Sequence, residues 1–180
     1  MVFETYRMVN QEVMYIEEMF DSNGKRCATI KETGQFVYVD MSPLTLINAS
    51  LRSIGYDLKS AQASAKWIIG LKQLGPFMVN PIHNICLFPH KLTKKGITIW
   101  FNPAQIKRTG SFNRKTKIEF INGETLVVEG KVTTFNNKLI KAEQLRRITM
   151  EIAQDPLSYT IDPQKEQLQY RKNKKEEEKK

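Results

Sequence analysis

The chain has 180 residues, 41% of them hydrophobic, and a formal net charge of +9 from 28 Lys and Arg against 19 Asp and Glu. This length suffices for one ordinary hydrophobic core, and because no signal peptide and no run of about 18 apolar residues is present, an exported or membrane-spanning protein is not expected. Cys27 and Cys86 lie far apart and are too few for a disulfide framework, so the composition favours a cytoplasmic protein with two buried thiols.

The first 40 residues carry the pattern of a β-meander. Short runs rich in β-branched and aromatic residues occupy 13–16, 27–31 and 36–40, and Thr33-Gly34 between the last two is a turn signal. We expect three antiparallel strands here.

A helix is predicted over residues 43–54. Ser42 offers a side-chain oxygen as N-cap, Pro43 suits the first helical position, and apolar residues recur at steps of three and four. Residues 60–66 favour a further short helix, whereas 67–69 are expected to be extended.

The middle of the chain contains three apolar runs and a basic segment. Residues 77–79, 85–88 and 97–101 are predicted to be strands, two of them followed by proline-containing turns. The segment 107–117 holds Gly110, Ser111 and Asn113 among its cations, and we expect it to form a mobile basic loop.

A hairpin and a long helix should complete the fold. Asn122-Gly123 between the strand-like runs 116–121 and 124–128 is a strong hairpin signal, because a tight primed turn needs positive φ at both central residues. Apolar residues sharing one face over 135–153 predict the helix.

These elements define the fold class that the sequence predicts. Residues 1–163 are expected to form a single α+β domain with a mostly antiparallel sheet and helices near 43–54 and 135–153. The tail 164–180 is almost entirely charged and polar, so we expect it to be disordered.

The chain lacks the common catalytic and cofactor-binding motifs. No Gly-x-Gly-x-x-Gly, no Gly-x-x-x-x-Gly-Lys-Ser/Thr and no Gly-x-Ser-x-Gly is present. His83, Cys86 and His90, with Cys27 as a fourth ligand, have the residue types of a zinc site, but their spacing does not form the usual close pairs. We expect a non-enzymatic protein without a metal or cofactor.

Positive charge is concentrated in one stretch of the sequence. Residues 58–118 contain eleven Lys and Arg and no Asp or Glu, whereas residues 1–57 hold five basic and eight acidic side chains, and 119–163 hold five and seven. Solvated surfaces usually mix both signs, and a focused field attracts polyanions. The charge pattern therefore indicates an anionic partner, with mere solubility as the alternative.

Aromatic residues are interleaved with these cations. Most of them lie in apolar runs and are expected in the core, a set that comprises Trp67, Phe77, Phe88, Trp100 and Phe101. Phe112 lies between Gly110-Ser111 and Asn113-Arg114, so it is the candidate for an exposed wedge or stacking side chain.

A resemblance to a known family rests on the order of several short motifs. In chain order they are Met41-Ser42-Pro43-Leu44, Ser50, Gly55, Met78-Val79-Asn80-Pro81, Asn84-Ile85-Cys86-Leu87-Phe88-Pro89, Trp100, Phe120-Ile121-Asn122-Gly123-Glu124-Thr125, Phe135 and Leu145-Arg146. Over roughly residues 10–150 the chain resembles the competence transcription factors of the ComK type.

The resemblance implies a bacterial, nucleoid-associated DNA-binding activator of competence genes, which serve DNA uptake. It also implies A·T-rich target boxes recognised largely through the minor groove, assembly as a dimer or dimer of dimers, and turnover through an adaptor and a Clp-type protease, for which residues 159–163 are the loose counterpart of the adaptor-binding motif. The basic side chains expected to contact DNA are Lys59, Lys66, Lys72, Lys94, Lys95, Lys107, Arg108, Arg114, Lys115 and Lys117.

Two other partners fit the same charge pattern. An RNA-binding or single-strand-binding module would use these cations together with stacking aromatics. A non-enzymatic regulator would present the basic surface to an acidic protein.

Overall fold

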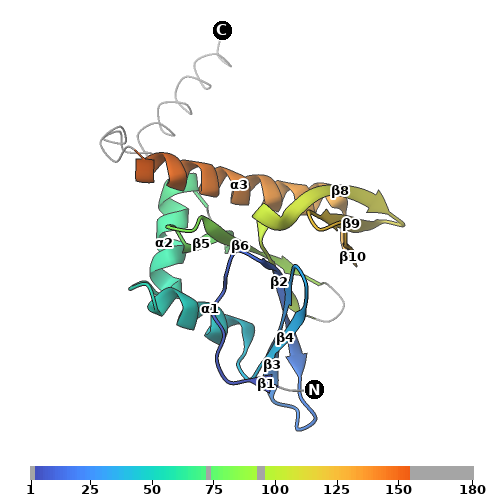
Figure 1. Cartoon of the computed structure of the whole chain (residues 1–180). Helices are drawn as coiled ribbons and strands as arrows, with labels where there is room; N and C mark the ends of the chain where they lie inside the picture. Colours follow the sequence, from blue (N-terminus) through green and yellow to red (C-terminus); the bar gives the residue numbers. More distant parts are fainter. Residues whose placement is uncertain (1–2, 72–73, 93–95, 155–180) are drawn as a thin grey trace.

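The computed structural model describes residues 3–71, 74–92 and 96–154, and its elements form an α+β fold, as the sequence predicted (Figure 1). The predicted tail 164–180 and the counterpart of the adaptor-binding motif lie outside these residues. So do Lys72, Lys94 and Lys95.

A seven-stranded sheet forms the body of the molecule, with strand order β1-β4-β3-β2-β7-β6-β5. All neighbouring strands pair antiparallel except β1 and β4, which are parallel. Its strands are β1 (Phe3–Glu4), β2 (Val13–Phe20), β3 (Arg26–Glu32), β4 (Phe36–Val39), β5 (Phe77–Asn80), β6 (Ile85–Lys91) and β7 (Thr98–Phe101). The predicted N-terminal meander and the three central strands are confirmed.

Helix α1 (Pro43–Arg52) covers one face of this sheet and confirms the predicted helix. The hydroxyl of Ser42 accepts a hydrogen bond from the amide of Thr45 at 3.3 Å, and Pro43 occupies the first turn. Leu46 and Ile47 are buried completely. The capping residues therefore set the start of the helix, and burial of its apolar stripe holds it on the sheet.

Helix α2 (Leu58–Ile69) is longer than predicted. The carboxylate of Asp57 accepts a hydrogen bond from the amide of Ser60 at 2.6 Å, and Gly70 ends the helix in the left-handed region at φ +64°. The expectation that residues 67–69 are extended was wrong, because they continue the last turn up to this glycine.

A separate three-stranded sheet, of order β10-β9-β8, follows the short 3-10 helix η1 (Pro103–Gln105). Its strands are β8 (Ile106–Phe112), β9 (Lys115–Phe120) and β10 (Thr125–Val128). The hairpin predicted at Asn122-Gly123 is confirmed, but its turn is not the tight primed one, because only Gly123 has positive φ, +87°. The mobile loop predicted over 107–117 was wrong: these residues form a second hairpin, whose two-residue turn places Asn113 and Arg114 at positive φ, +49° and +61°.

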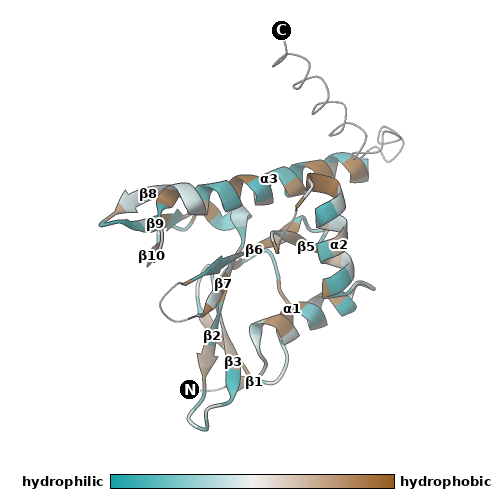
Figure 2. Cartoon of the chain, turned by 180° about the vertical axis from the view of Figure 1, so that it is seen from behind, coloured by the Kyte–Doolittle hydropathy of each residue, from teal (hydrophilic) through white to brown (hydrophobic). Residues whose placement is uncertain are grey.

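Helix α3 (Val132–Gln154) runs along the molecule from the small sheet to α2, as Figure 1 and the reverse view in Figure 2 both show. Its inner side buries Phe135, Ala142 and Leu145. Within the described chain, no helix combines the length and apolar character that a membrane span needs.

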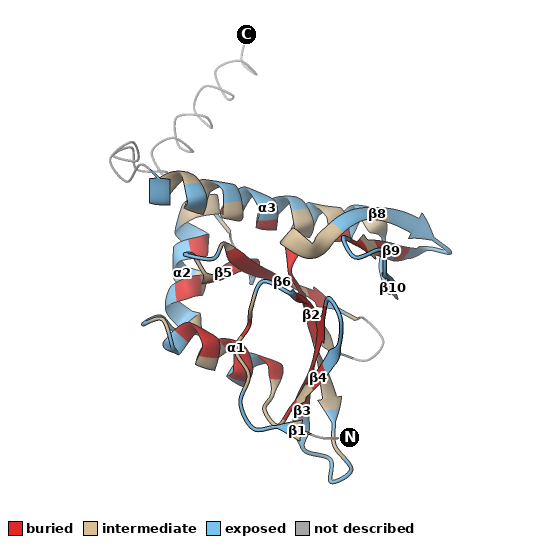
Figure 3. Cartoon of the chain, in the orientation of Figure 1, coloured by how far each residue is buried: buried red, intermediate tan, exposed pale blue. Residues whose placement is uncertain are grey.

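An aromatic cluster joins α3 to both sheets. The ring centroids of Phe88 and Phe101 lie 5.4 Å and 5.3 Å from that of Phe135, and Tyr15 stacks on Phe120 at 5.9 Å. The strands β2, β6, β7 and β9, which carry these rings, and the inner side of α3 are accordingly among the buried parts of the fold (Figure 3). The core thus fixes the small sheet against the body.

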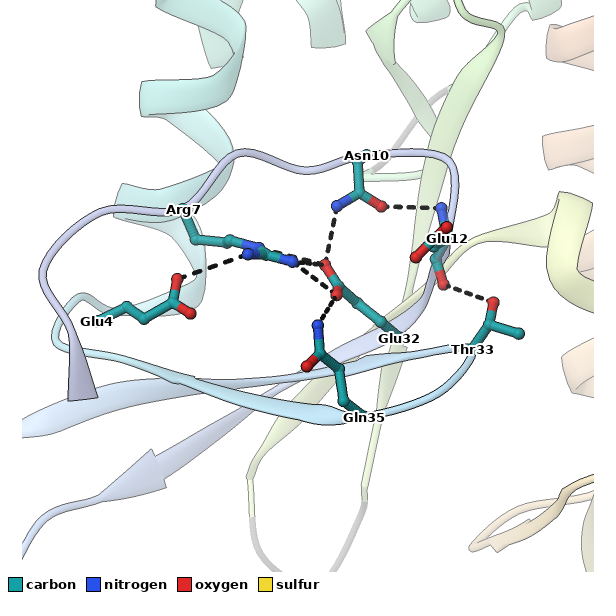
Figure 4. A network of polar contacts seen from close by, with 7 residues as sticks. All are labelled: Glu4, Arg7, Asn10, Glu12, Glu32, Thr33 and Gln35. Carbon is teal, nitrogen blue, oxygen red and sulfur yellow. Dashed lines mark hydrogen bonds and ion pairs between the residues drawn. The ribbon is translucent and has the colours of Figure 1, made fainter. Parts of the chain in front are cut away.

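A buried carboxylate ties the N-terminal segment to the sheet (Figure 4). The side chain of Glu32 is 1% exposed and receives hydrogen bonds from Arg7 at 2.7 and 2.8 Å, Asn10 at 2.8 Å and Gln35 at 2.9 Å. Burial by itself raises the pKa of Glu32, but these hydrogen bonds outweigh it and the pKa is lowered overall.

Candidate nucleic-acid interface

The small sheet has one buried and one exposed face. On β9, Thr116, Ile118 and Phe120 alternate inward and are buried. Thr109 on the same inner side hydrogen-bonds to Asn136 of α3, with 2.6 Å between the two side-chain oxygens. The residues that alternate with these along β8 and β9 point the other way and therefore face solvent.

That outer face carries most of the hairpin's positive charge. The cross-strand pairs on it are Arg108 with Glu119, Gly110 with Lys117, and Phe112 with Lys115. We call the cationic side chains on this face and at its turn the basic face; they are Lys107, Arg108, Arg114, Lys115 and Lys117. All five residues are exposed.

A β-bulge places two of these cations beside one carboxylate. The register shifts between Ile106 and Arg108, so Lys107 is the extra residue of the bulge. The ammonium of Lys107 lies 3.2 Å and the guanidinium of Arg108 2.6 Å from Glu119. Hydrogen bonds from Arg108 and Lys107 hold the pKa of Glu119 below its usual range.

The hairpin is anchored at its base and free at its tip. At the base, the amide of Ile121 donates to the carbonyl of Gln105 at 2.9 Å, the side chain of Asn122 donates to the carbonyl of Thr33 at 3.0 Å, and Glu124 pairs with Lys31 at 2.8 Å. The opposite end, at Asn113-Arg114, projects beyond the N-terminal end of α3 (Figure 1). The basic face therefore lies on a fixed but protruding ribbon.

The structure brings five of the predicted side chains together and separates two others. Lys59 and Lys66 are exposed on α2, which lies at the opposite end of α3 from the small sheet (Figures 1 and 2). Lys72, Lys94 and Lys95 lie outside the described residues.

The aromatic predictions were mostly right. Phe77, Phe88, Phe101 and Trp100 are buried, and Phe112 is 51% exposed beside the basic turn. Trp67 was expected in the core but is 46% exposed, because it lies on the outer side of α2.

Glu119 was not identified from the sequence as part of this surface. The carboxylate ends the acid-free stretch, and only the bulge reveals that it faces two cations. Glu119 occupies the next alternate position after Lys115 and Lys117 in the same strand-like run, and this period of two is the signal that points to it.

The candidate metal ligands occupy different environments. Cys27 and Cys86 are both buried, and desolvation raises the pKa of the Cys86 thiol. The Nε2–H of His90 donates to the carbonyl of Glu129 at 2.7 Å. Over the described residues, no group of three His, Cys, Asp or Glu side chains has the arrangement of a metal site.

Fold and surface define a small α+β domain whose most prominent exposed feature is a cationic β-ribbon. Comparison with known proteins gives the family: the ComK protein family model matches residues 3–154, and the chain belongs to that family. A relative described as a competence transcription factor of Bacillus subtilis (strain 168) is 26% identical over 145 residues, which cover 79% of this chain and 74% of that protein. No solved structure matches the chain significantly.

Proposed function

We propose that this protein is a transcription regulator of competence genes that binds A·T-rich double-stranded DNA, largely through the minor groove, with the basic face of the β8–β9 hairpin. Family membership and the competence transcription factor of B. subtilis support the regulatory role. The protein acts as a dimer or a dimer of dimers on DNA, in the cytoplasm at the nucleoid. It needs no cofactor and performs no catalysis.

The observation that carries the DNA-binding proposal is the unneutralised charge at the hairpin tip. Among the described residues, no ion pair involves Arg114, Lys115 or Lys117, although all three are exposed. Lys115 and Lys117 are alternate residues of one strand, so their Cα atoms are about 6.6 Å apart. Two cations at this spacing on one exposed strand can each contact a phosphate of a DNA backbone, and such contacts supply most of the affinity for duplexes.

The side chains at the tip, and not the ribbon as a whole, suit a narrow groove. A two-stranded ribbon with its side chains is too wide for a minor groove of about 6 Å, but its tip carries cations without a carboxylate between Phe112 and Ile118. An A·T-rich minor groove is narrow and strongly negative, and it attracts Arg and Lys side chains that can enter it. Groove width would then contribute to sequence preference.

Replacement of Arg114 and Lys115 by Ala tests this interface. The double variant should bind every duplex more weakly, and the slope of log affinity against log salt should fall by about 1.8 because two phosphate contacts are lost. A charge-matched control replaces Arg52 on α1 and Lys141 on α3, and it should leave the slope nearly unchanged. Equal slopes for the wild-type protein and the Arg114/Lys115 variant would contradict the proposed interface.

Lys59 and Lys66 are exposed on α2, away from the hairpin, and their contact with DNA needs a separate test. Their replacement by Ala tests whether α2 contacts the same duplex. A lowered slope would extend the interface to α2, and an unchanged slope would confine it to the hairpin.

Competition among nucleic acids separates the proposal from its alternatives. An A·T-rich duplex should compete better than a G·C-rich duplex or single-stranded RNA, at both low and physiological salt. Preference for RNA would favour the single-strand-binding module, and loss of all preference at physiological salt would favour an acidic protein partner. Sedimentation of the protein with and without the duplex measures the assembly state.

A further inference from the structure

Phe112 lies in the hairpin of the proposed DNA interface, and the role that we infer for it rests on that proposed function. Phe112 is the last residue of β8 and lies directly opposite Lys115, with the turn residues Asn113 and Arg114 between them. Both turn residues have positive φ, so the strands stay paired up to the tip. The ring is therefore held at a defined position rather than on a loose loop.

The ring of Phe112 lacks the stacking contact that Phe120, the other aromatic residue of the hairpin, makes. Phe112 is 51% exposed, whereas Phe120, at the other end of the same hairpin, is 1% exposed and stacks on Tyr15. Within the described part of the chain, no ring–ring contact and no cation over the ring involves Phe112. The ring therefore makes little contribution to the core of the domain.

The neighbours of the ring match the chemistry around a DNA base step. Lys115 opposite it and Arg114 beside it provide charges for the phosphates that flank a step, and the ring between them provides an apolar surface for the bases. Proteins that insert apolar side chains between base pairs combine these two features, because the charges hold the backbone while the wedge replaces part of the base stacking.

We propose that Phe112 is a wedge residue that inserts between adjacent base pairs when the tip of the β8–β9 hairpin enters the groove. Insertion partly unstacks one step and kinks the duplex. Pyrimidine–purine steps, which unstack most easily, are therefore preferred under the tip. Sequence preference then comes from deformability at that step, in addition to groove width.

The experiment places the fluorescent adenine analogue 2-aminopurine at each TpA step of an A·T-rich duplex in turn and adds saturating full-length protein. The analogue brightens when it is unstacked. With the wild-type protein, fluorescence should rise at one step, and with Phe112→Ala that rise should be lost while the affinity falls by about tenfold or less. Phe112→Trp, which retains a planar ring, should keep the rise.

The matched control is Val127→Ala. Val127 lies on the same outer face, opposite Lys117 on β10, and is 41% exposed, but it is further from the tip. This variant should behave as the wild-type protein in both readouts. A full fluorescence rise with Phe112→Ala, or equal losses with Phe112→Ala and Val127→Ala, would overturn the wedge.

The failure of the wedge and the failure of the proposed function give different results. If the wild-type protein binds the duplex without a fluorescence rise at any step, the wedge is wrong and the DNA-binding proposal stands. If the wild-type protein does not bind the duplex, both are wrong.

Discussion

Two carboxylates of this protein, Glu32 and Glu119, each bind an arginine, but their surroundings give the two pairs different roles. Glu32 is 1% exposed and receives Arg7, Asn10 and Gln35, whereas Glu119 is 17% exposed and its partner Arg108 is 74% exposed. Charges that are buried need every hydrogen bond they have, and charges at the surface can exchange their partners for water or a ligand. A carboxylate–arginine pair is thus a structural contact in the first case and a part of the proposed binding surface in the second.

The largest effect should come from Arg7→Ala. Removal of the arginine leaves the buried carboxylate of Glu32 with only Asn10 and Gln35, and the free energy of unfolding should fall by about 3 kcal/mol. Urea unfolding measures it. DNA affinity of the folded fraction should be unchanged, because the side-chain hydrogen bonds of Glu32 come from Arg7, Asn10 and Gln35 and none from the basic face.

The control for this change is Glu4→Gln. Glu4 forms an exposed ion pair with Arg7 at 3.7 Å, and its loss should cost less than about 0.5 kcal/mol. If Arg7→Ala cost no more than Glu4→Gln, the two amide side chains alone would satisfy Glu32 and the comparison between the two carboxylates would fail.

His90 is a third polar side chain to compare with the two carboxylates; it is buried and connects the body to the small sheet. Its Nε2–H donates to the carbonyl of Glu129, and its buried Nδ1 has no partner in the described chain. Burial lowers the pKa of His90 from the ordinary value of 6.5, which outweighs the opposing hydrogen bond to Glu129, and the charge of Lys138 lowers it further. Protonation would place a proton on Nδ1 with no acceptor to receive it.

The sign of the pH effect follows from that lowered pKa. The unfolded chain binds the proton more readily than the folded one below about pH 6.5, so stability is complete above this pH and falls on acidification by at most about 1.4 kcal/mol per pH unit. His90→Gln should reduce this dependence between about pH 7 and pH 5, where carboxylates contribute little. His83→Gln, on an exposed turn, is the control. An unchanged pH dependence in His90→Gln would show that His90 is protonated without cost.

The sequence predicted those elements whose signals are local. Ser42 and Pro43 mark the start of α1, and Asn122-Gly123 marks the place of the β9–β10 hairpin, so both positions were predicted correctly, although the turn has positive φ only at Gly123. Gly110 and Ser111 instead predicted a loop. That prediction was wrong because β8 is held by its pairing with β9 and not by its own composition.

For the candidate site, too, the sequence predicted only the features that have a local signal. Charge alone identified Arg114, Lys115 and Lys117, and position alone identified Phe112 as exposed. The distance of α2 from the hairpin depends on how α3 spans the molecule, and the contact of Glu119 with Lys107 depends on a bulge. Such features arise from tertiary packing and pairing register, which a single sequence does not contain.

Glu119→Gln should change stability least, because exposed ion pairs contribute less than about 1 kcal/mol each. Its effect should instead appear in binding: the two cations released from the carboxylate can turn to phosphates, so duplex affinity should rise about three- to tenfold and the salt slope should steepen. Glu143→Gln on α3 makes the same change in net charge at a distance, and a smaller rise there would separate local release from total charge. Weaker binding of Glu119→Gln would reverse the assignment, since the carboxylate would then be positioning Arg108 for its contact.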